Sequence, residues 1–302
     1  MTVSPQDGGG RPSGGARLRG LGGRAWIPLV LPALLILAVF FFYPLAEIVR
    51  RSFAEIAPPG TSPFGNYQWF FDTPANLTIL RRTIVTAVAV TAACLLVAYP
   101  YAYLMTVVGR RTRAVLLALV LVPFWTSLMV RNFAWIVLLQ DQGPVNDALA
   151  AVGVGRQRLI GNVSGVTIAM IQILLPFATL PIYAVLRGID RRLLQAAQSL
   201  GAPPWRAFLK VYLPLSAPGI LAGALIVFVI SLGFYVTPAL LGSPTNALIS
   251  QFIFIQVSTL LDWGRGGAMA VVLLVVAMVL IGLGSLAARR GQSRLSTGID
   301  PA

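Results

Sequence analysis

The sequence predicts an all-helical membrane protein. Of its 302 residues, 57% are apolar and only 11% are charged, and the mean hydropathy is +0.81. A soluble domain carries about 25% charged residues, so this chain has too few polar side chains to cover a soluble fold. Its apolar residues are gathered into stretches long enough to cross a bilayer, which takes about 20 residues in a helix.

Six stretches qualify as membrane-spanning helices. They are Trp26 to about Ala46, Thr83 to Val108, Ala114 to Leu139, about Ser164 to Leu186, about Pro218 to Leu241, and about Gly267 to Ala288. The first stretch exceeds the apolar core of a secretory signal, about 7–15 residues, and no small-residue cleavage site clearly follows it. We therefore expect it to be retained as a span.

The basic residues predict the direction of the spans. If the N-terminus lies in the cytoplasm, most of the 23 Lys and Arg residues fall in segments on the cytoplasmic side. Short cytoplasmic loops carry this excess in membrane proteins, so both termini are predicted to be cytoplasmic. The same distribution accounts for the net charge of +14 without a nucleic-acid partner.

The composition excludes several kinds of catalytic site. The chain contains no histidine and a single cysteine, Cys94. Histidine-ligated metal sites, Ser-His and Cys-His catalysis and a disulfide framework are therefore ruled out. The sequence also lacks the Gly-x-x-x-x-Gly-Lys-Ser/Thr loop that binds ATP. We expect no enzyme activity, no metal and no cofactor, and any ATP hydrolysis must occur in a separate subunit.

The remaining segments divide the chain into tails, loops and a membrane domain. Residues 1–24, rich in Gly and Arg, predict a disordered basic cytoplasmic tail. Residues 25–288 form the transmembrane domain, and residues 289–302 form a cytoplasmic C-terminal tail. Of the two long outer loops, residues 47–80 and 140–163, the first has an aromatic cluster typical of anchoring at the headgroups, and the second has a short helical stretch.

The cytoplasmic segment 187–217 predicts a helical hairpin. Asp190 can cap a helix from Arg191 to Leu200, and Gly201 stands where that helix would end. Two prolines then enforce a turn, and a second short helix follows over Trp205 to Tyr212, closed by Leu213 and Pro214. Such a hairpin could dock in a groove of another protein or lie on the lipid headgroups.

The hairpin also carries a motif. Gln195-Ala196-Ala197-x-x-x-Gly201, followed by Leu213-Pro214, resembles the EAA loop of binding-protein-dependent ABC importer permeases. Other segments look like the spermidine/putrescine-type branch: residues 98–103, 123–127, 130–135, 175–181 and 233–238. The resemblance runs from about residue 25 to 288. The motif's first acid is replaced by Gln195, which removes a charge partner for the ATPase.

This resemblance implies a type I ABC importer permease fold with six transmembrane helices in the bacterial cytoplasmic (inner) membrane. The implied partners are a second permease subunit, two ABC ATPase subunits and a periplasmic or lipid-anchored solute-binding protein. The leading cargo is a polyamine such as spermidine or putrescine; a phosphonate, an opine or iron remains open. The implied ATPase-coupling residues are Gln195, Ala196, Ala197, Gly201, Trp205, Leu213 and Pro214.

Candidates for the substrate path or gate are Arg131, Trp135, Pro176, Phe177, Phe234 and Tyr235. A charge inside the membrane costs about 2.5–3.5 kcal/mol on insertion scales and faces protein or water. Arg131 is therefore either a gate or substrate-path residue, or a structural charge that binds backbone carbonyls or snorkels outward. Pro176 and Pro181 either break their helix to line a pathway or merely kink it.

The main rival from another class is a secondary transporter. Such a protein would place ionisable residues near the middle of the membrane to couple transport to an ion. Arg131 alone is a poor set for that purpose.

Overall fold

The computed structural model describes residues 27–55 and 62–296, without the side chains of 27–29 and 287–296. The predicted basic tail, residues 1–24, lies outside this part of the chain. Every regular element in the described residues is a helix, as expected. The chain divides into two compact units between Arg50 and Arg51.

The first unit holds one long helix. It comprises α1 (Ile27–Leu37), the π-helical turn η1 (Ala38–Phe42) and the beginning of α2 (Tyr43–Ala54). Residues 30–54 of this helix are long and apolar enough to cross a membrane. The predicted first span is therefore a continuous helix that runs beyond Ala46.

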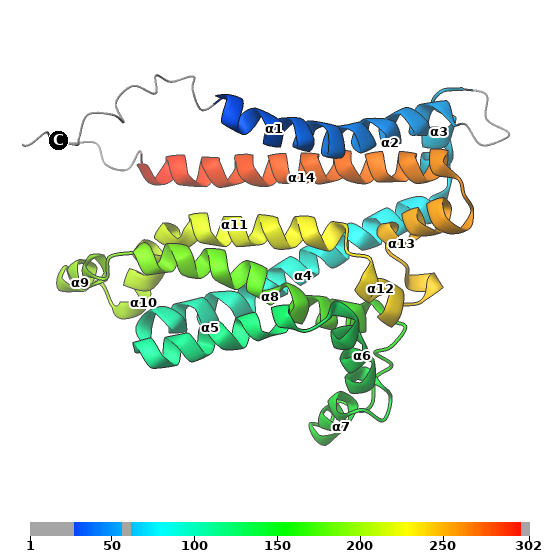
Figure 1. Ribbon diagram of the computed structural model, residues 1–302. Coiled ribbons are helices and arrows are strands. Elements are labelled where there is room, and N and C mark those ends of the chain that lie inside the picture. The colour runs from blue at the N-terminus through cyan, green and yellow to red at the C-terminus, as the bar shows by residue number, and fades with distance from the viewer. Residues whose placement is uncertain (1–26, 56–61, 297–302) are drawn as a thin grey trace, which may run out of the picture. The chain divides into compact units, whose positions relative to one another are not determined.

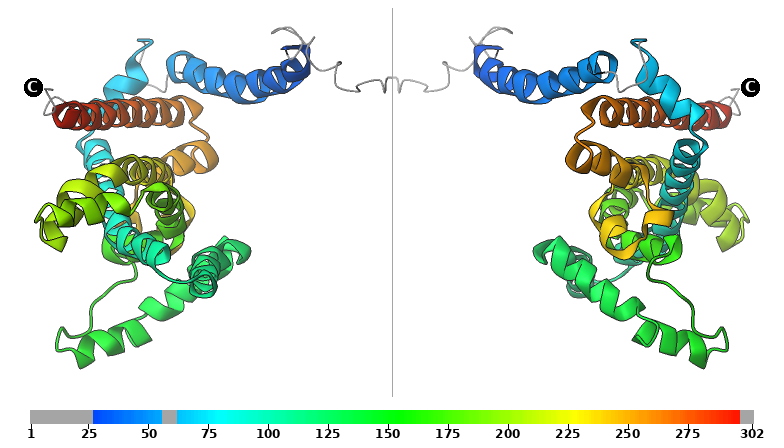
Figure 2. Two further views of the ribbon diagram at one scale, coloured as in Figure 1. Left: turned by 90° about the vertical axis from the view of Figure 1, so that its left-hand side faces the viewer. Right: turned by 90° about the vertical axis from the view of Figure 1, so that its right-hand side faces the viewer.

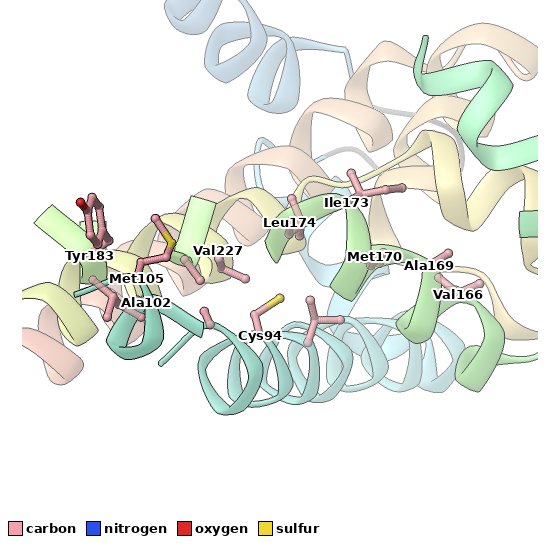
Figure 3. Close-up of a cluster of buried hydrophobic side chains, with 14 of the residues drawn as sticks. Cys94, Ala102, Met105, Val166, Ala169, Met170, Ile173, Leu174, Tyr183 and Val227 are labelled. Carbon is pink, nitrogen blue, oxygen red and sulfur yellow. The ribbon is translucent and has the colours of Figure 1, made fainter. Parts of the chain in front are cut away.

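The second unit is built on three packed helices, α4 (Pro74–Val107), α8 (Val163–Gly188) and α11 (Leu213–Leu232). Their shared core is dominated by buried aliphatic residues, with Cys94 among them. Figure 3 shows Cys94 of α4, Met170 of α8 and Val227 of α11 in this cluster. The core follows most of α8 and the second half of α4, and Val227 is its fully buried member from α11.

A smaller core joins four elements of this unit. It contains residues from α3 (Gly65–Asp72), α13 (Ile249–Phe254) and α14 (Trp263–Ser296), with the beginning of α4. Between α13 and α14 lies the π-helical turn η4 (Ile255–Thr259). The predicted second, fourth and sixth spans correspond to α4, α8 and α14. Helix α14 continues past the predicted end at Ala288.

The third predicted span, Ala114 to Leu139, is wrong as a single straight helix. Helix α5 (Arg110–Trp125) ends before Thr126, α6 (Leu128–Leu139) begins after Ser127, and the helical segment Leu128–Ala151 lies at 101° to α5. Thr126 and Ser127 have extended backbone, and Pro123 just before them cannot donate a helical hydrogen bond. Helix α6 is followed by α7 (Pro144–Ala151), the short helix expected in this loop. The two extend to one side of the three packed helices (Figures 1 and 2), and Leu139 at the end of α6 is buried in their core.

The fifth predicted span, Pro218 to Leu241, is shifted. A continuous helix runs from Pro204 to Leu232 through α10 (Pro204–Ala207), the π-helical turn η2 (Phe208–Tyr212) and α11. The expected separate second helix of the hairpin is therefore the beginning of this span. The helix ends at Leu232, and the chain then forms α12 (Val236–Leu241) and a 3-10 turn, η3 (Pro244–Asn246).

The two π-helical turns η1 and η2 share a local cause. Each comes directly before a residue–proline pair, Tyr43–Pro44 and Leu213–Pro214. A proline ring crowds the carbonyl four residues earlier and offers it no N–H. A wider turn moves that carbonyl aside and lets the helix continue, which is why Leu213–Pro214 does not end the helix as predicted.

Close packing of α11 on α8 depends on small residues. A Cβ atom at Gly219 would lie 2.9 Å from the Cβ of Val185 and 3.2 Å from the Cα of Ile182. Helices in membranes pack through such small residues. We expect Gly219→Val to lower the stability of the purified protein by about 1–3 kcal/mol through overpacking, measured as the shift of thermal unfolding in detergent.

The matched control is Gly282→Val in α14. A Cβ atom there meets no heavy atom within 4 Å, while the change in helix propensity from glycine to valine is the same at both positions. Equal unfolding temperatures for the two variants would contradict the close approach at Gly219.

Candidate functional site

The 187–217 hairpin forms as predicted in its first limb. Helix α9 (Arg192–Ser199) begins where the Asp190 carboxylate accepts the N–H of Arg192 at 2.9 Å. It ends at Ser199, and Gly201, just after the cap residue Leu200, has a φ of +86°, a left-handed conformation that glycine adopts without strain. Figure 1 places α9 and α10 at the opposite end of this unit from α6, α7 and α12.

The hairpin presents an unusually apolar exposed surface. No residue of α9 is buried, and Leu200 and Trp205 are 89% and 60% exposed. Gln195, Ala196 and Gly201 are also exposed. Solvent-exposed apolar side chains gathered in one place indicate a surface that another molecule covers.

Three predicted coupling residues lie elsewhere or deeper. Ala197 is half-buried on the inner side of α9. Leu213 and Pro214 are half-buried in the first turn of α11, so they belong to the continuous span rather than to the exposed surface. The structure therefore brings together Gln195, Ala196, Gly201 and Trp205 as an accessible set.

A separate cavity of about 360 Å³ lies where α5 and α6 meet α8 and α11. Its lining includes four of the six substrate-path candidates, Arg131, Pro176, Phe177 and Phe234. The ring of Phe124 also lines it and meets Phe177 edge-on, with the ring centroids 5.2 Å apart. Arg131 supplies the only charge among the lining residues, and the lining contains no carboxylate.

Sequence reasoning did not single out Phe124 or Thr126 as lining residues, although both lie in a segment that carried the resemblance. The signal that could have found them is Pro123 with the hydroxyl residues Thr126 and Ser127 three and four positions later in an apolar stretch, a pattern that favours a break.

The other two candidates lie outside the cavity lining. The indole N–H of Trp135 donates to the Gln172 side-chain oxygen at 3.2 Å, which ties α6 to α8. The ring of Tyr235 packs on Phe254, with centroids 4.8 Å apart.

Arg131 binds the end of helix α5. Its guanidinium donates to the carbonyl of Pro123, to the carbonyl of Thr126 at 3.1 Å and to the Thr126 hydroxyl at 3.3 Å. The last carbonyls of a helix lack partners within the helix and carry partial negative charge. Of the two roles expected for this residue, binding backbone carbonyls is observed, and the same side chain also lines the cavity.

The prolines of α8 and the break after α11 differ. Helix α8 runs unbroken through Pro176 and Pro181, so of the two alternatives expected there the broken helix is wrong, and a kink is the most that these prolines produce. The helix is interrupted at Gly233 to Tyr235, where the Ser250 hydroxyl donates to the Phe234 carbonyl at 2.7 Å. Side chains thus satisfy backbone groups that a broken helix frees.

Within the described ranges, no group of three or more His, Cys, Asp or Glu side chains is placed to hold a metal ion. The structure gathers three features that suit binding and movement. They are an exposed helical hairpin, a cavity beside a bent helix pair, and a helix interruption whose Phe234 carbonyl accepts a side-chain hydrogen bond.

Comparison with known proteins gives consistent results. Residues 98–295 match the family model described as "Binding-protein-dependent transport system inner membrane component". The spermidine/putrescine transport system permease protein PotB of Escherichia coli is 32% identical over 251 residues, covering 81% of this chain and 91% of that protein. PotB of Haemophilus influenzae is 32% identical over 255 residues, covering 84% and 86%.

A more distant relative is the sn-glycerol-3-phosphate transport system permease protein UgpA of Escherichia coli, 29% identical over 272 residues and covering 84% of this chain and 91% of that protein. Among solved structures, a chain of a bacterial alginate ABC transporter in complex with an alginate-bound periplasmic protein has a TM-score of 0.67 at 20% identity. The alignment covers 88% of this chain and 95% of that one, which shows the shared fold.

Proposed function

The chain belongs to the binding-protein-dependent transport system inner membrane component family, and we propose that it is the permease subunit of an ATP-driven importer for polyamines of the spermidine and putrescine class. The observation that supports a polyamine as the cargo is the similarity to PotB over four fifths of the chain. The chain is thus a multi-pass inner-membrane transport protein, and ATP hydrolysis belongs to a separate subunit.

The hairpin is the proposed contact with that ATPase, and we call it the coupling loop, residues 187–217. A permease must alternate between outward-open and inward-open states, and moving such an equilibrium from 1:99 to 99:1 takes about 5.5 kcal/mol of differential binding. ATP-driven closure of two ATPase subunits would supply it. The exposed Leu200, Trp205 and Gly201 support docking into a groove, with both termini then in the cytoplasm.

The cavity beside Arg131 is the proposed part of the substrate path. Cargo would arrive from a binding protein and pass between this chain and a second permease subunit. One observation favours a second candidate cargo. The lining carries a positive charge and no carboxylate, which suits an anionic group, and the relative UgpA is a glycerol-3-phosphate permease.

The test is uptake by proteoliposomes that contain this chain with its second permease and ATPase subunits. We expect labelled putrescine or spermidine to accumulate only under two conditions together. ATP must be present on the side of the membrane that holds the ATPase subunits, and the loaded binding protein must be present on the opposite side. Accumulation driven by an ion gradient without ATP would instead identify a secondary transporter. Uptake of glycerol-3-phosphate but not of polyamine would select the anionic cargo.

A further inference from the structure

Four aromatic rings connect the coupling loop to helix α4. They are Tyr99 and Tyr103 of α4 and Phe208 and Tyr212 of the π-helical turn η2, and we call them the aromatic joint. Phe208 and Tyr212 stack with centroids 5.6 Å apart and planes 23° apart. Tyr103 meets both of them edge-on, at 5.6 Å and 5.5 Å.

The joint is further fixed by burial and by one hydrogen bond. Tyr212 is almost completely buried, as is the adjacent Ala207. The Tyr99 hydroxyl lies 3.1 Å from the Ser216 hydroxyl in the next turn of α11. Edge-to-face and stacked rings are preferred aromatic geometries, so the second limb of the coupling loop is packed firmly against α4.

The first limb is attached in a different way. Helix α9 has no buried residue, and the Arg191 guanidinium donates to the carbonyl of Thr106 near the end of α4. The carbonyl of Tyr103 in turn accepts a hydrogen bond from the Thr106 hydroxyl at 2.7 Å. Both limbs of the loop are therefore attached to the same stretch of α4, residues 99–106.

We propose that the aromatic joint is the link through which movement of the coupling loop reaches α4, with Tyr103 as its positioning residue. This rests on the proposed function. Packed interfaces are bistable and do not deform continuously, so α4 must follow a loop that is clamped by rings. Because α10, η2 and α11 are one continuous helix, the same displacement reaches α4 and α11 together and moves two of the three core helices.

The experiment uses the complete reconstituted transporter and measures cargo taken up per ATP hydrolysed. We expect Tyr103→Ala to lower this ratio at least about fivefold, the lower end of typical coupling between sites, while ATP hydrolysis per assembled complex without binding protein is retained. Tyr103→Phe keeps the ring and should restore the ratio. Leu104→Ala is the matched control, because Leu104 is the next residue of α4 and is 44% exposed.

A purely structural role for Tyr103 would reduce the amount of assembled complex but leave the cargo-to-ATP ratio of the remainder unchanged, and that outcome overturns the proposal. If Tyr103→Ala does not assemble, Phe208→Leu removes a ring of the joint at similar volume and is judged by the same ratio. Failure of the unaltered complex to take up cargo with ATP would reject the proposed function. A normal cargo-to-ATP ratio in both Tyr103→Ala and Phe208→Leu would reject only the aromatic joint.

Discussion

Gly201→Asp in the coupling loop should abolish ATP-driven uptake while the protein still folds and inserts. A Cβ atom at this position meets no heavy atom within 4 Å, and the cost of its φ of +86° for an L-residue is about 1–2 kcal/mol. In a docked complex, by contrast, the new carboxylate would be buried against the ATPase without a partner, at about 3–5 kcal/mol. We therefore expect transport to fall at least about 100-fold, measured as cargo uptake at equal amounts of permease in the membrane.

Gly201→Asn is the matched control, because asparagine has the shape of aspartate, imposes a similar backbone strain and carries no charge. Partial uptake with asparagine and none with aspartate would locate the effect in the buried charge. Loss with both would indicate that the groove has no room for a side chain. Normal uptake and normal copurification of the ATPase with the aspartate variant would show that this surface is not the docking site and would favour a loop that lies on lipid.

The long apolar stretches were sufficient to predict most of the spans but not their shape. Helices α4, α8 and α14 follow from length and hydropathy, because an unbroken helix satisfies its own backbone in lipid. The bend at Thr126 and the continuous helix through Leu213 and Pro214 could not be predicted in this way. Hydropathy does not report the direction in which a helix runs. A helix can end, kink or continue at a proline, and the residues packed around the proline decide which.

The site divides along the same line. The end of α9 just before Gly201 was predictable because it depends on local backbone conformation. The acceptors of Arg131 and the contact of Phe124 with Phe177 were not, since both need the bend between α5 and α6 to exist first. The aromatic joint likewise joins residues about a hundred positions apart in sequence, so no local pattern reveals it.

Arg131→Met should destabilise the bend between α5 and α6 and strongly reduce uptake. The substitution removes the Arg131 donor from the carbonyl of Thr126 and from that of Pro123, which still accepts from the Thr126 hydroxyl and N–H. A polar group left without a partner costs about 1–3 kcal/mol. In a bilayer no water replaces the lost donor. We expect a lower unfolding temperature in detergent and at least a tenfold loss of transport, since about 1.4 kcal/mol is already a factor of ten.

Arg131→Lys separates the two roles that this side chain combines. An ammonium keeps the charge in the cavity but has a smaller, differently shaped set of donors than a guanidinium. If the clamp on α5 is what matters, lysine recovers only part of the stability and leaves the preference between polyamine and glycerol-3-phosphate unchanged. If the charge in the cavity sets that preference, methionine shifts it and lysine does not. A methionine variant as stable and as active as the unaltered protein would contradict both roles. The guanidinium contacts of Arg131 would then contribute neither to the bend nor to the substrate path.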